Sequence, residues 1–134
     1  MGPVYVVTNR SLDELLQASP EDYPVDFETM DREELRNDPP TGENGGVLVL
    51  DLSACPESNC LSRWEVVRNH PAVVALVEPD HVDRVQGLID QGVRVYLHEP
   101  IGRDELRQSL EALRKNRKYM DPSLSDSLVE RYLS

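Results

Sequence analysis

The chain has 134 residues, 39% of them hydrophobic and 29% charged, which is the composition of one globular domain and excludes a disordered chain. Its net charge of −11, from 25 acidic and 14 basic residues, argues against direct nucleic-acid binding, which needs clustered lysines and arginines. No apolar run approaches the roughly 20 residues that span a bilayer, and the start, MGPVYVV, lacks the basic region of a signal peptide, so we expect a cytoplasmic protein that does not contact membranes.

In chain order, runs rich in β-branched residues alternate with runs of helical periodicity. The predicted strands are residues 4–8, 25–29, 47–52, 72–77 and 93–97. The predicted helices are residues 11–17, 31–37, 61–69, 80–92 and 102–116. The helix at 80–92 should turn Val82, Val85, Leu88 and Ile89 inward, with Gly92 as its C-cap. This alternation predicts an α/β fold, a doubly wound parallel sheet of five strands with helices on both faces.

In such a sheet, functional side chains gather at the carboxyl ends of the strands. The strand ends carry Thr8, Asn9, Asp51, Val77, Glu78, His98 and Glu99. Asp51 therefore falls in the predicted pocket, where it is either a reactive carboxylate or the polar end of a strand. In the second case we expect it to be held by backbone N–H groups or by nearby Arg10.

Between residues 4 and about 117 the chain resembles the receiver domain of bacterial response regulators, which has a flavodoxin-like fold. The resemblance is carried by VLVLDLS at 47–53, by the spacing from Val77 through Gly92 and Tyr96 to Pro100, and by DEL at 104–106. It implies phosphoryl transfer from a histidine kinase of a two-component phosphorelay to Asp51, with Mg²⁺ as the charge clamp.

The other pocket positions depart from the pattern of the receiver family. Thr8 and Asn9 stand where that family has two Mg²⁺-binding acids, and Val77 stands where it has a Thr or Ser. Glu99 replaces the lysine before a proline, here Pro100. A transferring phosphoryl group is anionic and needs positive charge around it, and Mg²⁺ needs oxygen ligands. We therefore expect a degenerate pocket, with neither catalytic residue nor metal nor cofactor.

The tail, residues 114–133, resembles the linker that follows receivers in the NarL/LuxR family of transcription regulators. We expect a domain boundary at 117/118 and a linker helix that starts near Asp121 and Pro122, in residues 118–134. In that family a helix-turn-helix DNA-binding domain follows the linker, so the resemblance implies that such a domain can be attached to this one.

Cys55 and Cys60 follow Asp51 in a loop and lack the partners that a metal site at finger-like spacing would need. We expect free thiols, with a redox-linked disulfide as the alternative.

We predict a non-enzymatic, phosphorylation-independent pseudo-receiver that pairs with itself or docks a protein partner, as the N-terminal part of a transcription regulator. The expected face joins the fourth helix, fifth strand and fifth helix, with Arg84, Gln91, Tyr96 and Arg107 as the residues to watch. Tyr96 falls at the receiver family's rotating aromatic position, or packs as a half-exposed strand residue.

Two alternatives stay open at this point. One is a true phosphoacceptor in which Asp51 binds Mg²⁺ with Glu78 or Glu99. The other is a small enzyme or flavin binder, which lacks the phosphate-cradling loop after the first strand, where TNRSLDE stands.

Overall fold

The computed structural model of the protein describes residues 3–31, 33–34, 46–52, 72–78, 85–90 and 92–133. In chain order these residues form β1 (Val4–Val7), α1 (Leu12–Leu15), the 3₁₀ turn η1 (Pro20–Asp22), β2 (Phe27–Met30), β3 (Val47–Asp51), β4 (Val73–Val77), α4 (Val85–Asp90), β5 (Val95–His98), α5 (Arg103–Arg114), β6 (Tyr119–Met120) and α6 (Pro122–Leu133). None of the helices in these ranges is long and apolar enough to cross a membrane.

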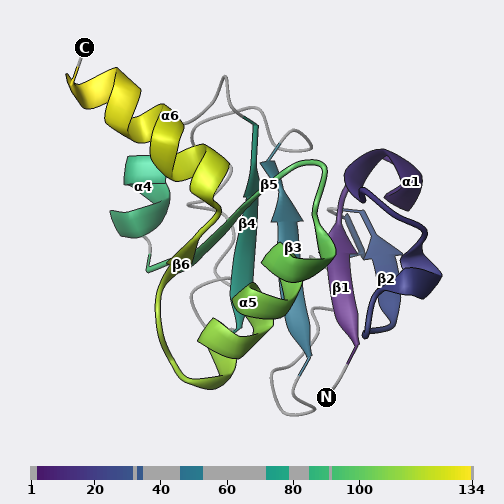
Figure 1. Ribbon diagram of the computed structural model, residues 1–134. Helices are drawn as coiled ribbons and strands as arrows, with labels where there is room; N and C mark the ends of the chain where they lie inside the picture. The colour runs from purple at the N-terminus through teal and green to yellow at the C-terminus, as the bar shows by residue number, and fades with distance from the viewer. Residues whose placement is uncertain are drawn as a thin grey trace.

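All the strands pair in parallel, in one sheet of order β2-β1-β3-β4-β5-β6 (Figure 1). β3 and β4 lie at the centre and are buried along their whole length, as their continuous apolar sequences predict. The order of the first five strands, 2-1-3-4-5, is that of the flavodoxin-like doubly wound fold. The expected parallel α/β architecture is therefore confirmed.

Alternate residues of the central strands point to opposite faces of the sheet, and each face has its own apolar layer. The first layer joins α4 and α6 to the sheet and includes Leu48, Leu50, Ala75, Val85, Leu88 and Leu124. The second layer joins α1 and α5 to the sheet and includes Val49, Val74, Leu76, Leu15, Leu106 and Leu110. Each buried leucine contributes roughly 1.5–3 kcal/mol relative to an exposed one, so both layers hold the helices in place.

Helix α4 ends at Asp90, and the predicted capping glycine, Gly92, follows it. Gly92 has a φ of 95°, and its N–H donates to the carbonyl of Ile89 at 3.0 Å, while the N–H of Val93 donates to Leu88 at 3.1 Å. The expectation that Ile89 faces inward is wrong, because its side chain is 48% exposed. Val85 and Leu88 define the buried stripe, and Ile89 lies one helical step beyond it.

Helix α1 is shorter than the predicted helix at 11–17. Leu16 is already extended and forms a parallel β-bridge with Ile101, in the loop between β5 and α5. The N–H of Ile101 donates to Leu15 at 2.7 Å, and the hydroxyl of Tyr23 donates to the carbonyl of Ile101 at 2.5 Å. These tertiary hydrogen bonds end the helix early and tie the β5–α5 loop to α1.

The tail adds a sixth strand to the five that we expected. Tyr119 pairs with Val95, and the N–H groups of Tyr119 and Asp121 donate to backbone carbonyls around β5 at 3.1 and 2.9 Å. Helix α6 then starts at Pro122, as predicted, and the Asp121 carboxylate accepts from the N–H of Ser123 at 3.0 Å. Leu124 is fully buried in the first apolar layer. The tail therefore packs on the sheet, while the domain boundary at 117/118 stays a prediction.

Several expected elements lie outside the described residues. These are the helix at 61–69, most of the helix at 31–37, the start of the helix at 80–92, and the loop with Cys55 and Cys60.

Candidate functional site

The carboxyl edge of the sheet brings Thr8, Asp51 and Glu99 together, as the strand assignment predicted. Thr8 follows β1, Asp51 is the last residue of β3, and Glu99 follows β5. Asp51 is only 1% exposed, so its carboxylate must be satisfied by the protein. The parallel pairing of β1 with β3 explains how Thr8 and its neighbour Arg10 reach Asp51.

Thr8 anchors one oxygen of Asp51. Its hydroxyl donates to Oδ2 at 2.6 Å, and the same hydroxyl accepts the backbone N–H of Arg10 at 3.0 Å. This second bond fixes the turn that follows β1 and directs the side chain of Arg10 back toward Asp51.

Arg10 occupies the space between the two carboxylates. Its Nε and Nη2 donate to Oδ2 and Oδ1 of Asp51 at 3.1 and 2.9 Å. Its Nη1 and Nη2 donate to Oε1 and Oε2 of Glu99 at 3.2 and 2.5 Å. One guanidinium therefore makes a two-point contact with both acids, the geometry in which arginine recognises carboxylates most strongly.

Arg10, Asp51 and Glu99 form a cluster of ion pairs that is largely shielded from solvent. The side chains of Arg10 and Glu99 are 24% and 19% exposed. Burial by itself lowers the pKa of Arg10, but the hydrogen bonds that it donates to Glu99 and Asp51, together with the negative charges of these two side chains, raise the pKa above its ordinary value. Arg10 therefore stays cationic between the two carboxyl groups.

Both carboxylate oxygens of Asp51 accept hydrogen bonds from the protein itself. Oδ1 accepts from Arg10, and Oδ2 accepts from both Thr8 and Arg10. Attack by Asp51 on a phosphoryl donor would first have to break these charge-assisted bonds. Among the described residues, no group of three or more His, Cys, Asp or Glu side chains could hold a metal ion.

The remaining pocket positions supply little chemistry. Asn9 is exposed on the loop after β1, and Val77 is buried with an apolar side chain that donates no hydrogen bond. Glu78 is half-buried just beyond β4. Pro100 is exposed and follows Glu99 through a cis peptide bond.

Of the four residues of the expected interface, only Tyr96 and Arg107 lie in the described part of the chain, so that interface stays a prediction. Arg84 and Gln91 lie outside the described residues. Tyr96 is buried in the first apolar layer, and its hydroxyl donates to the carbonyl of Val93 at 2.5 Å. The alternative prediction, that Tyr96 is a half-exposed strand residue, is therefore wrong. Arg107 is exposed on α5, which covers the opposite face of the sheet.

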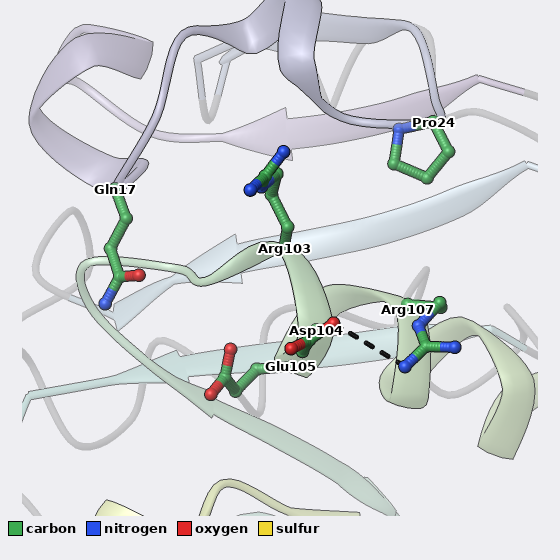
Figure 2. Close-up of a pocket in the computed structure, with 6 residues that line it drawn as sticks. All are labelled: Gln17, Pro24, Arg103, Asp104, Glu105 and Arg107. Carbon is green, nitrogen blue, oxygen red and sulfur yellow. Dashed lines mark ion pairs between the residues drawn. The ribbon is translucent and has the colours of Figure 1, made fainter.

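Arg107 lines a different hollow, a cleft of about 420 Å³ whose other lining residues are Gln17, Pro24, Arg103, Asp104 and Glu105 (Figure 2). Its guanidinium lies 3.5 Å from the Asp104 carboxylate, one helical turn earlier. Both side chains are well exposed, and such a pair contributes little to stability.

Sequence reasoning proposed Arg10 only as one partner of Asp51 and missed its pairing with Glu99. The available signal was an exchange of charge between two strand ends. Arg10 stands just after Thr8 and Asn9, the positions where acids were expected, and Glu99 stands after β5, where a lysine was expected. Two opposite replacements at one sheet edge indicate that the new side chains pair.

Comparison with known proteins supports the fold. No family model and no curated protein matches the sequence. One solved structure, the regulatory domain of the master biofilm regulator CsgD, superposes with a TM-score of 0.53 and 13% sequence identity, over 96% of this chain and 98% of that one. At this identity the likeness shows a shared fold only.

Proposed function

We propose that this chain is an atypical receiver domain, a signalling module that binds a protein partner or a second copy without phosphorylation. The observation that carries the proposal is the position of Arg10 between Asp51 and Glu99. The cation that a phosphoryl group would need is present, but both of its hydrogen-bonding edges are used by carboxylates of the protein itself. The site holds the edge of the sheet together and is not an enzyme's active site.

The fold supports the regulatory part of this proposal. The structural neighbour is described as a regulatory domain of a regulator of biofilms. We infer by analogy that this chain is the N-terminal part of a transcription regulator, with an attached DNA-binding domain that sets two heads at a fixed spacing when the module pairs. Direct contact with DNA by this domain is disfavoured by its net charge of −11.

The alternative, a phosphoacceptor with unusual metal ligands, loses support from the same contacts. Glu99 was one of its two candidate ligands, and both of its oxygens accept hydrogen bonds from Arg10. A metal ion there would have to displace the guanidinium from two partners at once.

Sedimentation velocity tests the proposal. The protein is run alone, with phosphoramidate and Mg²⁺, and with Mg²⁺ alone, over a range of micromolar concentrations. We expect the same distribution of species in the three conditions, because no phosphorylation step is available to change assembly. A dimer that forms only with the phosphodonor, and not in an Asp51→Asn variant, would overturn the proposal.

A further inference from the structure

A second cleft, of about 230 Å³, lies between α4 and the tail strand β6. Its described lining residues are Ile89, Val93, Arg94, Tyr96, Lys118, Tyr119 and Met120. The floor is apolar and fixed, because Tyr96 and Val93 are buried and joined by the hydrogen bond from the Tyr96 hydroxyl. Ile89 stands at this cleft with its side chain 48% exposed, so apolar surface is open to a partner.

Two cations flank this apolar floor. Because Val95 pairs with Tyr119, the preceding residues Arg94 and Lys118 lie beside each other at the start of the two strands. Both side chains are exposed, and Arg94 is oriented by a 2.7 Å hydrogen bond from Nη1 to the side-chain oxygen of Asn116. Neither forms an ion pair within the described part of the chain.

The charges indicate what covers the cleft. Neighbouring like charges on adjacent strands repel, and the repulsion is relieved when an anion lies between them. A second copy related by a two-fold axis through the cleft would bring the same two cations against their own counterparts. The net charge of −11 on each copy adds further repulsion between copies.

We propose that this cleft docks a segment of a partner protein that carries an apolar side chain beside one or more carboxylates. The apolar side chain covers Ile89 and Val93, and the carboxylates lie between Arg94 and Lys118. This proposal rests on the proposed function and specifies the chemistry of its partner. The preformed floor lowers the conformational cost of docking, and the cations select an acidic segment over a basic one.

An NMR titration tests the proposal with defined probes. The first probe is a short synthetic peptide in which pairs of glutamates alternate with pairs of leucines, added to the uniformly ¹⁵N-labelled chain. The second has lysine in place of each glutamate, and the third has serine in place of each leucine. We expect saturable amide shifts around 93–96 and 118–120 with the first peptide, and binding at least about tenfold weaker with the other two.

Charge exchange provides the sharpest control. Arg94→Glu combined with Lys118→Glu should weaken binding of the glutamate–leucine peptide by about tenfold and should create binding of the lysine–leucine peptide. Ile89→Ser should weaken binding of the glutamate–leucine peptide to the native chain and of the lysine–leucine peptide to the charge-exchanged chain. Two control substitutions should change neither binding: Val129→Ser, at an exposed valine of α6, and Arg103→Glu, on the first turn of α5. Unchanged amide spectra away from each substitution show that the variants are folded.

Three outcomes would overturn the proposal: no saturable shift, shifts outside the cleft, or equal binding of the three peptides. Concentration-dependent shifts at the cleft without any peptide would identify a second copy as the occupant and would also overturn it. Failure here is distinguishable from failure of the proposed function, because docking is measured without a phosphodonor. A protein that fails to dock the peptide can still be independent of phosphorylation.

Discussion

The guanidinium of Arg10 lies against the carboxylate of Asp51 through two nitrogens, at 2.9 and 3.1 Å, although the residues are 41 positions apart in the chain. Asp51 is buried, so this contact neutralises a charge that water cannot reach. The same guanidinium holds Glu99, which begins the loop between β5 and α5. A single side chain therefore connects the ends of three strands.

Replacing Arg10 by alanine should lower the free energy of unfolding by roughly 2–4 kcal/mol, because it leaves the buried carboxylate of Asp51 without its cation. The combined variant Arg10→Ala with Asp51→Asn should recover part of this loss, since the uncompensated charge is then gone. Urea unfolding followed by circular dichroism measures both. As a matched control, Arg103→Ala removes an exposed arginine and should change stability by no more than about 0.5 kcal/mol. A loss of the same size in the control would refute the assigned role.

Glu99 should not tolerate the lysine that receivers have at this position. Glu99→Lys places a second cation beside Arg10 and should cost about 1–3 kcal/mol, whereas Glu99→Gln keeps an acceptor and should cost less than about 1 kcal/mol. The combined variant Glu99→Lys with Arg10→Ala should lose less free energy of unfolding than the sum of the two single losses, because the lysine can then pair with the Asp51 carboxylate. Additive losses in the same unfolding assay would contradict the charge exchange.

The parallel α/β architecture and the location of the site could be predicted from the sequence, because buried parallel strands are continuous apolar runs and their ends carry the polar residues. The pairing of Arg10 with Glu99 could not be derived from one strand at a time, since it depends on how β1 and β5 are placed across the sheet. The two-residue strand β6 escaped prediction for a similar reason. Tyr119 and Met120 form a strand only because β5 offers them backbone partners.

The exposure of Ile89 and the burial of Tyr96 show a second limit of sequence reasoning. The helical pattern identifies an apolar face, but the neighbouring elements decide which residue at its margin is covered. Tyr96 is buried in the same apolar layer as Leu124 of the tail helix α6. The pattern of the tail alone does not indicate how closely it packs on the sheet.

Magnesium should not stabilise the protein. A ligand that binds only the folded state raises the melting temperature, but Arg10 stands against Asp51 and Glu99 where the ion would bind. We expect millimolar MgCl₂ to give the same melting temperature as NaCl at equal ionic strength. A saturable rise with Mg²⁺ that is lost in Asp51→Ala would favour the phosphoacceptor alternative.

The tail should contribute to the stability of the folded domain. Leu124→Ala removes a fully buried side chain and should cost about 2–5 kcal/mol. Val129→Ala, on the same helix, changes a side chain that is 54% exposed and should cost no more than about 0.5 kcal/mol. Thermal or urea unfolding compares the pair directly. Equal, small effects would mean that α6 is not held against the sheet in solution.

The central claim, that Arg10 and Glu99 have replaced the phosphoryl chemistry at Asp51, is tested most directly by intact-protein mass spectrometry. The chain is incubated with phosphoramidate and Mg²⁺ beside a receiver domain that is known to accept phosphate, which confirms that the donor is active. We predict that the mass of this protein stays unchanged while the control receiver gains a phosphoryl group. A gain of one phosphoryl group that disappears in Asp51→Asn would contradict the account.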